Sequence, residues 1–258
     1  MINYIKSEIY RNLRSKGNYI FIASLIGIGV FLNIVLYLFS KSDPTFPFAT
    51  TKFAFSALYT SLSLVMYLCA SAVSLTWGQE YKNNTLKNTV SLGISKNSIY
   101  FSKLLISILY ILIVGILVSG AFIISAYILL DNSGIEELKL LINSLITAIP
   151  IFLISITLTN ALYSIIEKEM NVVFSWISII IIIPFLLNML GKKIELFKIL
   201  SSYMPINIIK ATFDERNMNL VLGWTTPEGI LKSIIVAIIG CTACYLIGLE
   251  LFKRKEIK

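Results

Sequence analysis

Six long apolar runs constrain the fold of this 258-residue chain more than any other feature of its sequence. They fall at about residues 19–39, 54–77, 104–130, 140–166, 172–190 and 231–252. A helix needs about 20 apolar residues to cross the hydrocarbon layer of a bilayer, and each run is close to that length or longer. With 57% hydrophobic and 14% charged residues, the chain also holds more apolar surface than a soluble domain of its size can bury. We therefore expect an all-α, polytopic membrane protein with six transmembrane helices in a single domain over residues 1–258.

The basic residues predict how these helices insert. Most of them flank the runs on the side that holds the N-terminal residues, the loop at 78–103 and the end of the chain. Short cytoplasmic segments carry an excess of Lys and Arg, so we expect both termini in the cytoplasm. This topology also accounts for the net charge of +8, which would otherwise suggest a nucleic-acid partner. Trp77, Trp176 and Trp224 fall near the ends of runs, as interface anchors do.

Residues 1–18 are expected to form an amphipathic helix along the inner membrane interface. At helical spacing its apolar side chains share one face: Ile2, Ile5, Ile9 and Leu13. Glu8 and Arg11 point elsewhere, as in a helix that lies in the headgroup layer.

Missing residue types exclude several functions. The chain has no histidine, which removes Ser-His and Cys-His nucleophilic pairs and His-ligated metal sites. No Asp, Lys or Arg falls in the middle of a run, and Lys103 and Glu250 are expected to reach water at cytoplasmic ends. This pattern argues against a proton-coupled carrier, a voltage-gated channel and an intramembrane aspartyl protease. The Gly191-Lys192 pair lacks the rest of a phosphate-binding P-loop, so energy for moving a solute must come from a partner.

Polar residues within the runs are candidates for a substrate path. The second run carries Ser56, Thr60, Ser63, Tyr67, Ala70 and Ser74, whose spacings of three and four keep them on one helical face. Asn33 in the first run and Thr157 and Asn160 in the fourth add further polar groups, and an unpaired amide in hydrocarbon is costly. Such residues line either a substrate path or a dimer interface, with close packing between helices as the alternative.

The loop at 78–103 is too long for a tight turn and too short for a domain. Its start is expected to form a short helix that carries Leu86 and Val90, with Gly93 at its end. A short helix that protrudes between two spans can be pushed by a cytoplasmic partner. Leu86 is expected to be its apolar docking contact.

The layout and the loop together carry a resemblance to a known family. The loop pattern consists of Glu80, Thr85, Leu86, Lys87, Gly93, Ile94 and Ser95, and the chain closes with Leu251-Phe-Lys-Arg-Lys-Glu-Ile257. With a basic amphipathic helix before six spans, the chain resembles permease subunits of type-2 ABC exporters. It is most similar to the small bacterial permeases that export bacitracin, lantibiotics and other antimicrobial peptides.

The resemblance implies a function and a set of partners. The loop residues would form a coupling helix that docks on a separate cytoplasmic ATPase, present in two copies, which would hold ATP and Mg. A second permease, identical or a sister subunit, would face this one in the lipid of a bacterial plasma membrane. Residues 191–230 would form short re-entrant helices on the outer side. The pair would export an amphipathic peptide, antibiotic or other hydrophobic substrate, while this chain itself would bind no cofactor and catalyse no reaction.

Two other interpretations stay open at this point. The chain could be a non-transporting sensor, scaffold or immunity subunit that binds a peptide or partner. It could also be a membrane-embedded enzyme, but the sequence shows no cluster of polar residues near one interface that would suit one.

Overall fold

A computed structural model describes residues 2–43, 45–82, 85–214 and 219–255 of the protein. Positions 83–84 of the predicted coupling loop and 215–218 of the predicted outer segment lie outside the described residues. The elements, in chain order, are α1 (Ile2–Arg14), α2 (Lys16–Ser42), α3 (Thr51–Thr60), α4 (Leu62–Lys82), α5 (Thr85–Ser91), α6 (Lys96–Leu129), α7 (Ile135–Ile165), α8 (Glu169–Ile177), the π-helix η1 (Ser178–Ile182), α9 (Ile183–Gly191), α10 (Glu195–Ser202), α11 (Pro205–Ile208), β1 (Thr212–Asp214), β2 (Asn219–Val221), the 3₁₀ turn η2 (Gly223–Thr225) and α12 (Pro227–Arg254).

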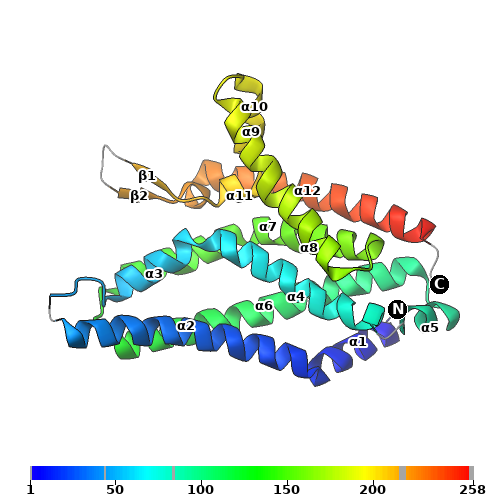
Figure 1. The fold of residues 1–258 in the computed structure, drawn as a ribbon, viewed down its shortest axis with the longest axis horizontal. Helices are drawn as coiled ribbons and strands as arrows, with labels where there is room; N and C mark the ends of the chain where they lie inside the picture. The colour runs from blue at the N-terminus through cyan, green and yellow to red at the C-terminus, as the bar shows by residue number, and fades with distance from the viewer. Residues whose placement is uncertain (1, 44, 83–84, 215–218, 256–258) are drawn as a thin grey trace.

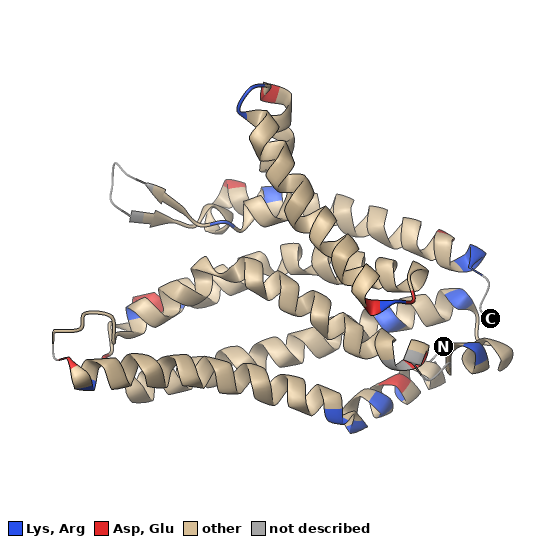
Figure 2. Cartoon of the chain, viewed as in Figure 1, with Lys and Arg blue, Asp and Glu red and all other residues tan. Residues whose placement is uncertain are grey.

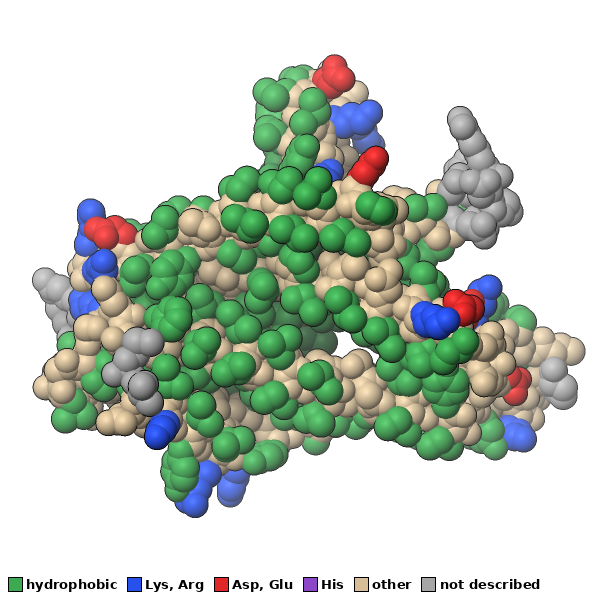
Figure 3. All heavy atoms as spheres, turned by 180° about the vertical axis from the view of Figure 1, so that it is seen from behind, with side chains coloured by type: hydrophobic (Ala, Val, Ile, Leu, Met, Phe, Trp, Pro, Cys, Tyr) green, Lys and Arg blue, Asp and Glu red, His purple; other side chains and the backbone are tan. Residues whose placement is uncertain are grey.

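The expected all-α membrane fold is confirmed. Five helices or continuous helical stretches of the described chain are long and apolar enough to cross a membrane, and the bent pair α3–α4 makes a sixth if it is one span. Except for the oblique stretch α8–η1–α9, they run side by side, with α1, α5 and both termini at one end (Figure 1). Charged side chains gather at the two ends and on the α9–α10 projection (Figure 2). Apolar side chains cover the broad surface between them, as contact with lipid requires (Figure 3).

Helix α7 is the centre of the bundle. It packs against α12, α4 and α3, whereas α2 packs mainly against α6. In their most apolar windows, 44% of α7 is buried inside the protein but only 6% of α2. Small side chains on α7, such as Ala148, Ser155 and Ala161, allow its neighbours to approach closely.

The second apolar run is not one straight helix, so the predicted face of small residues is broken. The chain bends by 60° between α3 and α4. Just before the bend, the Thr60 and Ser61 hydroxyls donate hydrogen bonds to the backbone carbonyls of Ser56 and Ala57, at 2.8 and 2.6 Å. Such bonds from Ser and Thr to the preceding turn bend helices. Two of the predicted path residues, Ser56 and Thr60, therefore lie on a different helix from the other three, Ser63, Tyr67 and Ser74.

The fifth apolar run contains a π-helical turn. Pro184 cannot donate a backbone hydrogen bond, and its ring clashes with the carbonyl four residues earlier in a regular α-helix. The chain accommodates this proline with η1 immediately before it. The stretch α8–η1–α9 crosses the bundle at a steep angle, and α9 and α10 project from its side (Figure 1). Gly191 is required at their junction, because a Cβ there would lie 2.8 Å from the Lys198 Cα.

Helix α1 is amphipathic as expected, but part of its polar face, expected to point to water, is buried in the protein. It packs against α6 and buries Tyr4 and Glu8. The predicted apolar face is open, since Ile9 is 39% exposed and Leu13 is 63% exposed. The polar face of α1 therefore points into the protein, and the apolar face remains free to contact lipid.

The segment at 191–230 holds more than the expected short helices. Helices α10 and α11 are followed by an antiparallel hairpin in which Phe213 of β1 pairs with Leu220 of β2. Thr226 then caps α12 by accepting a hydrogen bond from the Gly229 backbone N–H at 3.1 Å, and Pro227 occupies the first helical position. The re-entrant placement of this segment stays a prediction.

Candidate functional site

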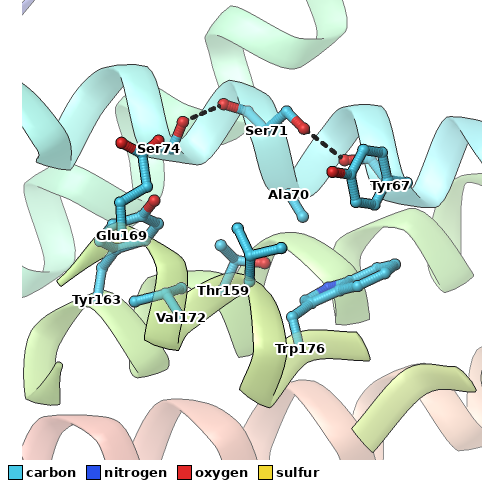
Figure 4. A pocket seen from close by; sticks show the side chains of 10 residues that line it. Tyr67, Ala70, Ser71, Ser74, Thr159, Tyr163, Glu169, Val172 and Trp176 are labelled. Carbon is cyan, nitrogen blue, oxygen red and sulfur yellow. Dashed lines mark hydrogen bonds between the residues drawn. The ribbon is translucent and has the colours of Figure 1, made fainter. Parts of the chain in front are cut away.

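A cavity of about 170 Å³ opens between α4, α7 and α8 (Figure 4). Its lining residues come from the middle turns of α4, the last turns of α7 and the length of α8, and the last turns of α7 lie in the half of the bundle nearer to the termini. The lining residues are Tyr67, Ala70, Ser71, Ser74, Thr159, Tyr163, Glu169, Val172, Val173 and Trp176. Glu169 is the charged residue of this set.

The cavity has an aromatic end and a polar end. The rings of Tyr67 and Trp176 form an edge-to-face pair with centroids 5.7 Å apart. Ser74, Tyr163 and Glu169 lie together at the other end (Figure 4). The Tyr163 hydroxyl is buried at this end and interacts with Ser74 and Glu169. A site with this division suits an amphipathic molecule.

Hydrogen bonds hold the aromatic end of the cavity in place. Trp176 Nε1 donates to Ser155 Oγ at 3.2 Å, and Ser155 Oγ donates to the Met66 carbonyl at 2.8 Å. These two bonds link α8, α7 and α4, the three helices around the cavity. The cavity is therefore built on fixed helices and not on loops.

The sequence predicted part of this lining. Tyr67 and Ser74, both predicted path residues, line the cavity together with Ala70 from the same stripe. Ser56, Thr60 and Ser63 are not among the lining residues. The bend between α3 and α4 separates the first two of them from the cavity wall.

The predicted amides make contacts between helices. Asn33 Nδ2 donates to Ser125 Oγ at 2.7 Å and so joins α2 to α6. Asn160 Oδ1 accepts from Trp77 Nε1 at 2.8 Å and joins α7 to α4. Thr157 Oγ1 donates to the Leu153 carbonyl of its own helix. All three residues are buried within this chain, and the path or dimer role expected for them stays a prediction.

Seven lining residues were missed from the sequence: Ser71, Thr159, Tyr163, Glu169, Val172, Val173 and Trp176. Trp176 was taken for an interface anchor, as were Trp77 and Trp224, yet each of these tryptophans is at most 2% exposed. The i, i+4 spacing of Thr159 and Tyr163, followed closely by Glu169, is a polar pattern that the sequence does contain.

The predicted coupling helix exists as α5, but its exposed residues differ from those expected. Leu86 is buried, only 4% exposed, in an apolar cluster that includes Trp77 and Tyr100. The expectation that Leu86 is the exposed docking contact is therefore wrong. Leu92, just after α5, is 80% exposed. Gly93 follows with a φ of +81°, a left-handed conformation that glycine adopts without steric cost.

The other predicted coupling residues lie on or beside this loop. Thr85 and Lys87 lie on α5, with Lys87 exposed, and Ile94 is half-buried after the turn. Ser95 caps α6, since its side chain accepts a hydrogen bond from the Ser98 backbone N–H at 3.3 Å. Glu80 differs from the rest because it is buried in the last turn of α4.

Glu80 belongs to a buried cluster of four charges, here called the ion cluster: Glu8, Arg11, Glu80 and Lys103. Lys103 Nζ lies 2.7 Å from Glu8 Oε2 and 3.0 Å from Glu80 Oε1. Arg11 contacts the same two oxygens at 2.6 and 2.8 Å. The Lys103 side chain is fully buried and also donates to the Thr76 carbonyl at 2.8 Å, so the expectation that it reaches water is wrong.

The cluster shifts the pKa values of its two carboxyl groups in opposite directions. Burial raises the pKa of the Glu8 carboxyl despite the attraction of Lys103 and Arg11. Burial alone would raise the pKa of the Glu80 carboxyl, but the attraction of Lys103 and Arg11 is stronger and lowers it below the usual range. With two cations and two carboxylates, the cluster is neutral overall. It spans α1, α4 and α6, which come from distant parts of the sequence.

Comparison with known proteins identifies one family. The family described as ABC-2 family transporter protein matches residues 4–184. The match covers more than half of the chain and includes the cavity, the ion cluster and α5. Searches of curated proteins and of solved structures gave no match.

Proposed function

Because the chain belongs to the ABC-2 family of transporter proteins, we propose that it is the membrane-spanning permease of an ATP-driven exporter in a bacterial plasma membrane. In this role it forms the path, and a separate cytoplasmic ATPase in two copies binds ATP and Mg and supplies the energy. A second permease, identical or a sister subunit, faces it. ATP binding and hydrolysis favour different conformations of this assembly, and the difference drives transport.

The cavity is the observation that carries this proposal. Part of its lining lies toward the end of the bundle that holds both termini, which we assign to the cytoplasm, and there an exported molecule enters from the cytoplasm or the inner leaflet. Its aromatic end, formed by Tyr67 and Trp176, suits the apolar part of a substrate. Its polar end, with Ser74, Tyr163 and Glu169, suits a polar group. The substrate class that fits is an amphipathic peptide, an antibiotic or another largely hydrophobic molecule.

The surface near α5 supplies the contact with the ATPase. Lys87, Asn88 and Leu92 are exposed at the end of the bundle that holds both termini. Leu92 is 80% exposed and so offers an apolar side chain to a partner at this end of the bundle. We place the docking contact there and assign Leu86 to holding α5 against the bundle.

The test begins with co-expression of the permease and the ATPase encoded by a neighbouring gene. The complex is purified, its subunit masses are measured, and it is reconstituted in proteoliposomes with bacitracin and a lantibiotic as probes. We expect two ATPase copies for each permease pair and ATP hydrolysis that rises with at least one probe. A permease that purifies alone and stimulates no ATPase would favour a sensor, scaffold or immunity subunit and contradict the exporter.

Two tryptophan substitutions test the cavity itself. Ser74→Trp fills the polar end and is expected to abolish probe-stimulated hydrolysis while the complex still assembles. Ser24→Trp is the matched control, because Ser24 is exposed on α2, away from the cavity helices. Equal stimulation of ATP hydrolysis in the two variants would show that the cavity is not part of the substrate path.

A further inference from the structure

The ion cluster contains the buried charges that the proposed path does not use. The three helices that carry its residues, α1, α4 and α6, meet at the base of the loop that carries α5. Glu80 lies in the last turn of α4, just before α5, and Lys103 lies in the first turns of α6, just after the loop. The 3.0 Å contact between them joins the two ends of this loop. Glu8 and Arg11 add α1 to the same junction.

We propose that Glu8, Arg11, Glu80 and Lys103 are positioning residues that make α1, α5 and the inner ends of α4 and α6 move as one unit. Motion of this unit driven by an ATPase rests on the proposed function, whereas the rigid unit itself does not. A force on α5 then reaches α1, which lies along the membrane interface, as well as the two spans. The interfacial helix is thereby part of the coupling apparatus and not only a topology signal.

The shared oxygens make the cluster act as a whole. Glu80 Oε1 accepts from Arg11, Lys103 and the Tyr4 hydroxyl, the last at 3.4 Å. Glu8 Oε2 accepts from the same two cations. Each cation therefore contacts both carboxylates, and withdrawing any one member leaves an unbalanced charge in a buried place. Helix α1 cannot separate from the α4–α6 junction without exposing or unpairing charges on both sides.

Stability alone does not explain such a cluster. Well-packed apolar side chains of similar volume often stabilise a protein as much as a buried ionic cluster or more. Glu80 Oε2 is also buried with no hydrogen-bond partner among the described residues, which costs free energy. What ionic contacts add is a defined geometry, as polar groups do when they fix the register of packed helices.

The rest of α1 does not supply that geometry. Ile9 and Leu13 are exposed on the outward face, where lipid accepts them at any position along the interface. Tyr4 adds one apolar contact, because it belongs to the cluster that buries Leu86 and Trp77. The charges therefore determine where α1 sits, and Leu86 links the same region to α5.

Hydrogen exchange of the purified permease in lipid nanodiscs tests the rigid unit without any ATPase. Glu8→Gln changes only α1, the peripheral helix, so the spans are expected to fold. We expect backbone exchange to rise about tenfold or more in α5 as well as in α1, because local opening of the two is shared. Faster exchange confined to α1 would overturn the proposal.

A balanced variant separates charge from shape. Glu8→Gln combined with Lys103→Met leaves the Arg11–Glu80 pair, which is neutral. We expect exchange in α5 to return toward the wild-type rate, although two contacts are gone. Exchange in the double variant that is faster than in Glu8→Gln alone would overturn the charge argument. Glu137→Gln, which removes an ion pair at the opposite end of the bundle, is the matched control and is expected to leave α5 unchanged.

The complex with the ATPase gives the second measurement. Glu8→Gln is expected to keep basal ATP hydrolysis and to reduce its stimulation by probe several-fold, because α5 no longer carries α1 with it. If no ATPase associates with the wild-type permease, the proposed function fails while the exchange result still decides the rigid unit. If stimulation in Glu8→Gln equals that of wild type, α1 is not part of coupling.

Discussion

The two ends of the bundle use the same residue types in opposite ways. We call the end that holds both termini the inner end and the opposite one the outer end. At the inner end, Lys103 is fully buried and contacts two carboxylates at 2.7 and 3.0 Å. At the outer end, Lys52 is 68% exposed and lies 3.6 Å from Glu137. Charged residues mark both ends in the same manner (Figure 2), yet the inner ones meet in a buried junction of three helices, whereas the outer pair joins α3 to α7 near the surface. The position of a charge near a span end therefore does not reveal whether it faces water or holds the fold.

The difference has an electrostatic cause. Water around the outer pair screens its attraction, and an exposed pair of this kind contributes about 0–1 kcal/mol. The inner cluster lies in a region of lower dielectric, where each interaction is stronger and each unpaired charge is more costly. Substitutions at the two ends should consequently differ by several-fold in their effect on the free energy of unfolding.

Lys103→Met should have the largest effect. It leaves two buried carboxylates with Arg11 as the remaining cation of the cluster, and breaking a buried ionic contact on one side costs about 3–5 kcal/mol. The free energy of unfolding, measured by denaturant titration in mixed micelles, should fall by that amount. The loss should persist in high salt, because buried charges are screened little. A loss below about 1 kcal/mol would mean that the inner end behaves like the outer one.

Two leucines of the coupling region give the next contrast. Leu86→Ala removes a buried side chain and should lower the free energy of unfolding by about 2 kcal/mol. Leu92→Ala should change it by less than about 0.5 kcal/mol, because Leu92 is 80% exposed. Binding of the ATPase, followed by co-purification, should show the reverse order, with the greater loss at Leu92. Equal stability of the two variants would contradict the assigned orientation of α5.

Two glycines of α12 compare the inner and outer halves of the same helix contact. A Cβ at Gly248 would lie 2.9 Å from the Ala161 Cα of α7, so the helices must separate to accept it. Gly248→Ala should therefore destabilise the protein by about 1–3 kcal/mol. At Gly240 the nearest atom, from the Ile154 side chain, would be 3.5 Å away. Gly240→Ala should be neutral or stabilising by up to about 1 kcal/mol, because alanine favours the helix. Equal thermal midpoints for the two would contradict the close inner crossing.

The apolar runs allowed the membrane fold to be predicted because lipid requires long apolar helices. The bend at Ser61 was not predicted, because it depends on which carbonyls the Ser and Thr hydroxyls contact and not on hydropathy. The buried side of α1 was not predicted either, for a related reason. Hydropathy assigns Glu8 and Arg11 to water, but here Lys103 and Glu80 from distant segments neutralise them.

The cavity was partly predictable. Tyr67 and Ser74 were identified because a polar stripe at helical spacing is visible within one segment. Glu169 and Trp176 were not, because their place in the lining follows from the steep crossing of α8 against α4 and α7. Residues that meet across helices become a site through tertiary geometry, which local patterns do not encode.

Glu137→Gln should have a much smaller effect than Lys103→Met, and it completes the comparison of the two charged ends. The substitution removes the exposed pair with Lys52 and one of the acidic residues in the first turn of α7, where negative charge favours the helix. Together these contributions should amount to no more than about 1 kcal/mol. The effect should also shrink as salt is raised to about 1 M, where the Debye length is about 3 Å, unlike that of Lys103→Met. A salt-independent loss of about 3 kcal/mol would show that the outer pair is as structural as the inner cluster, and the contrast between the two ends would no longer hold.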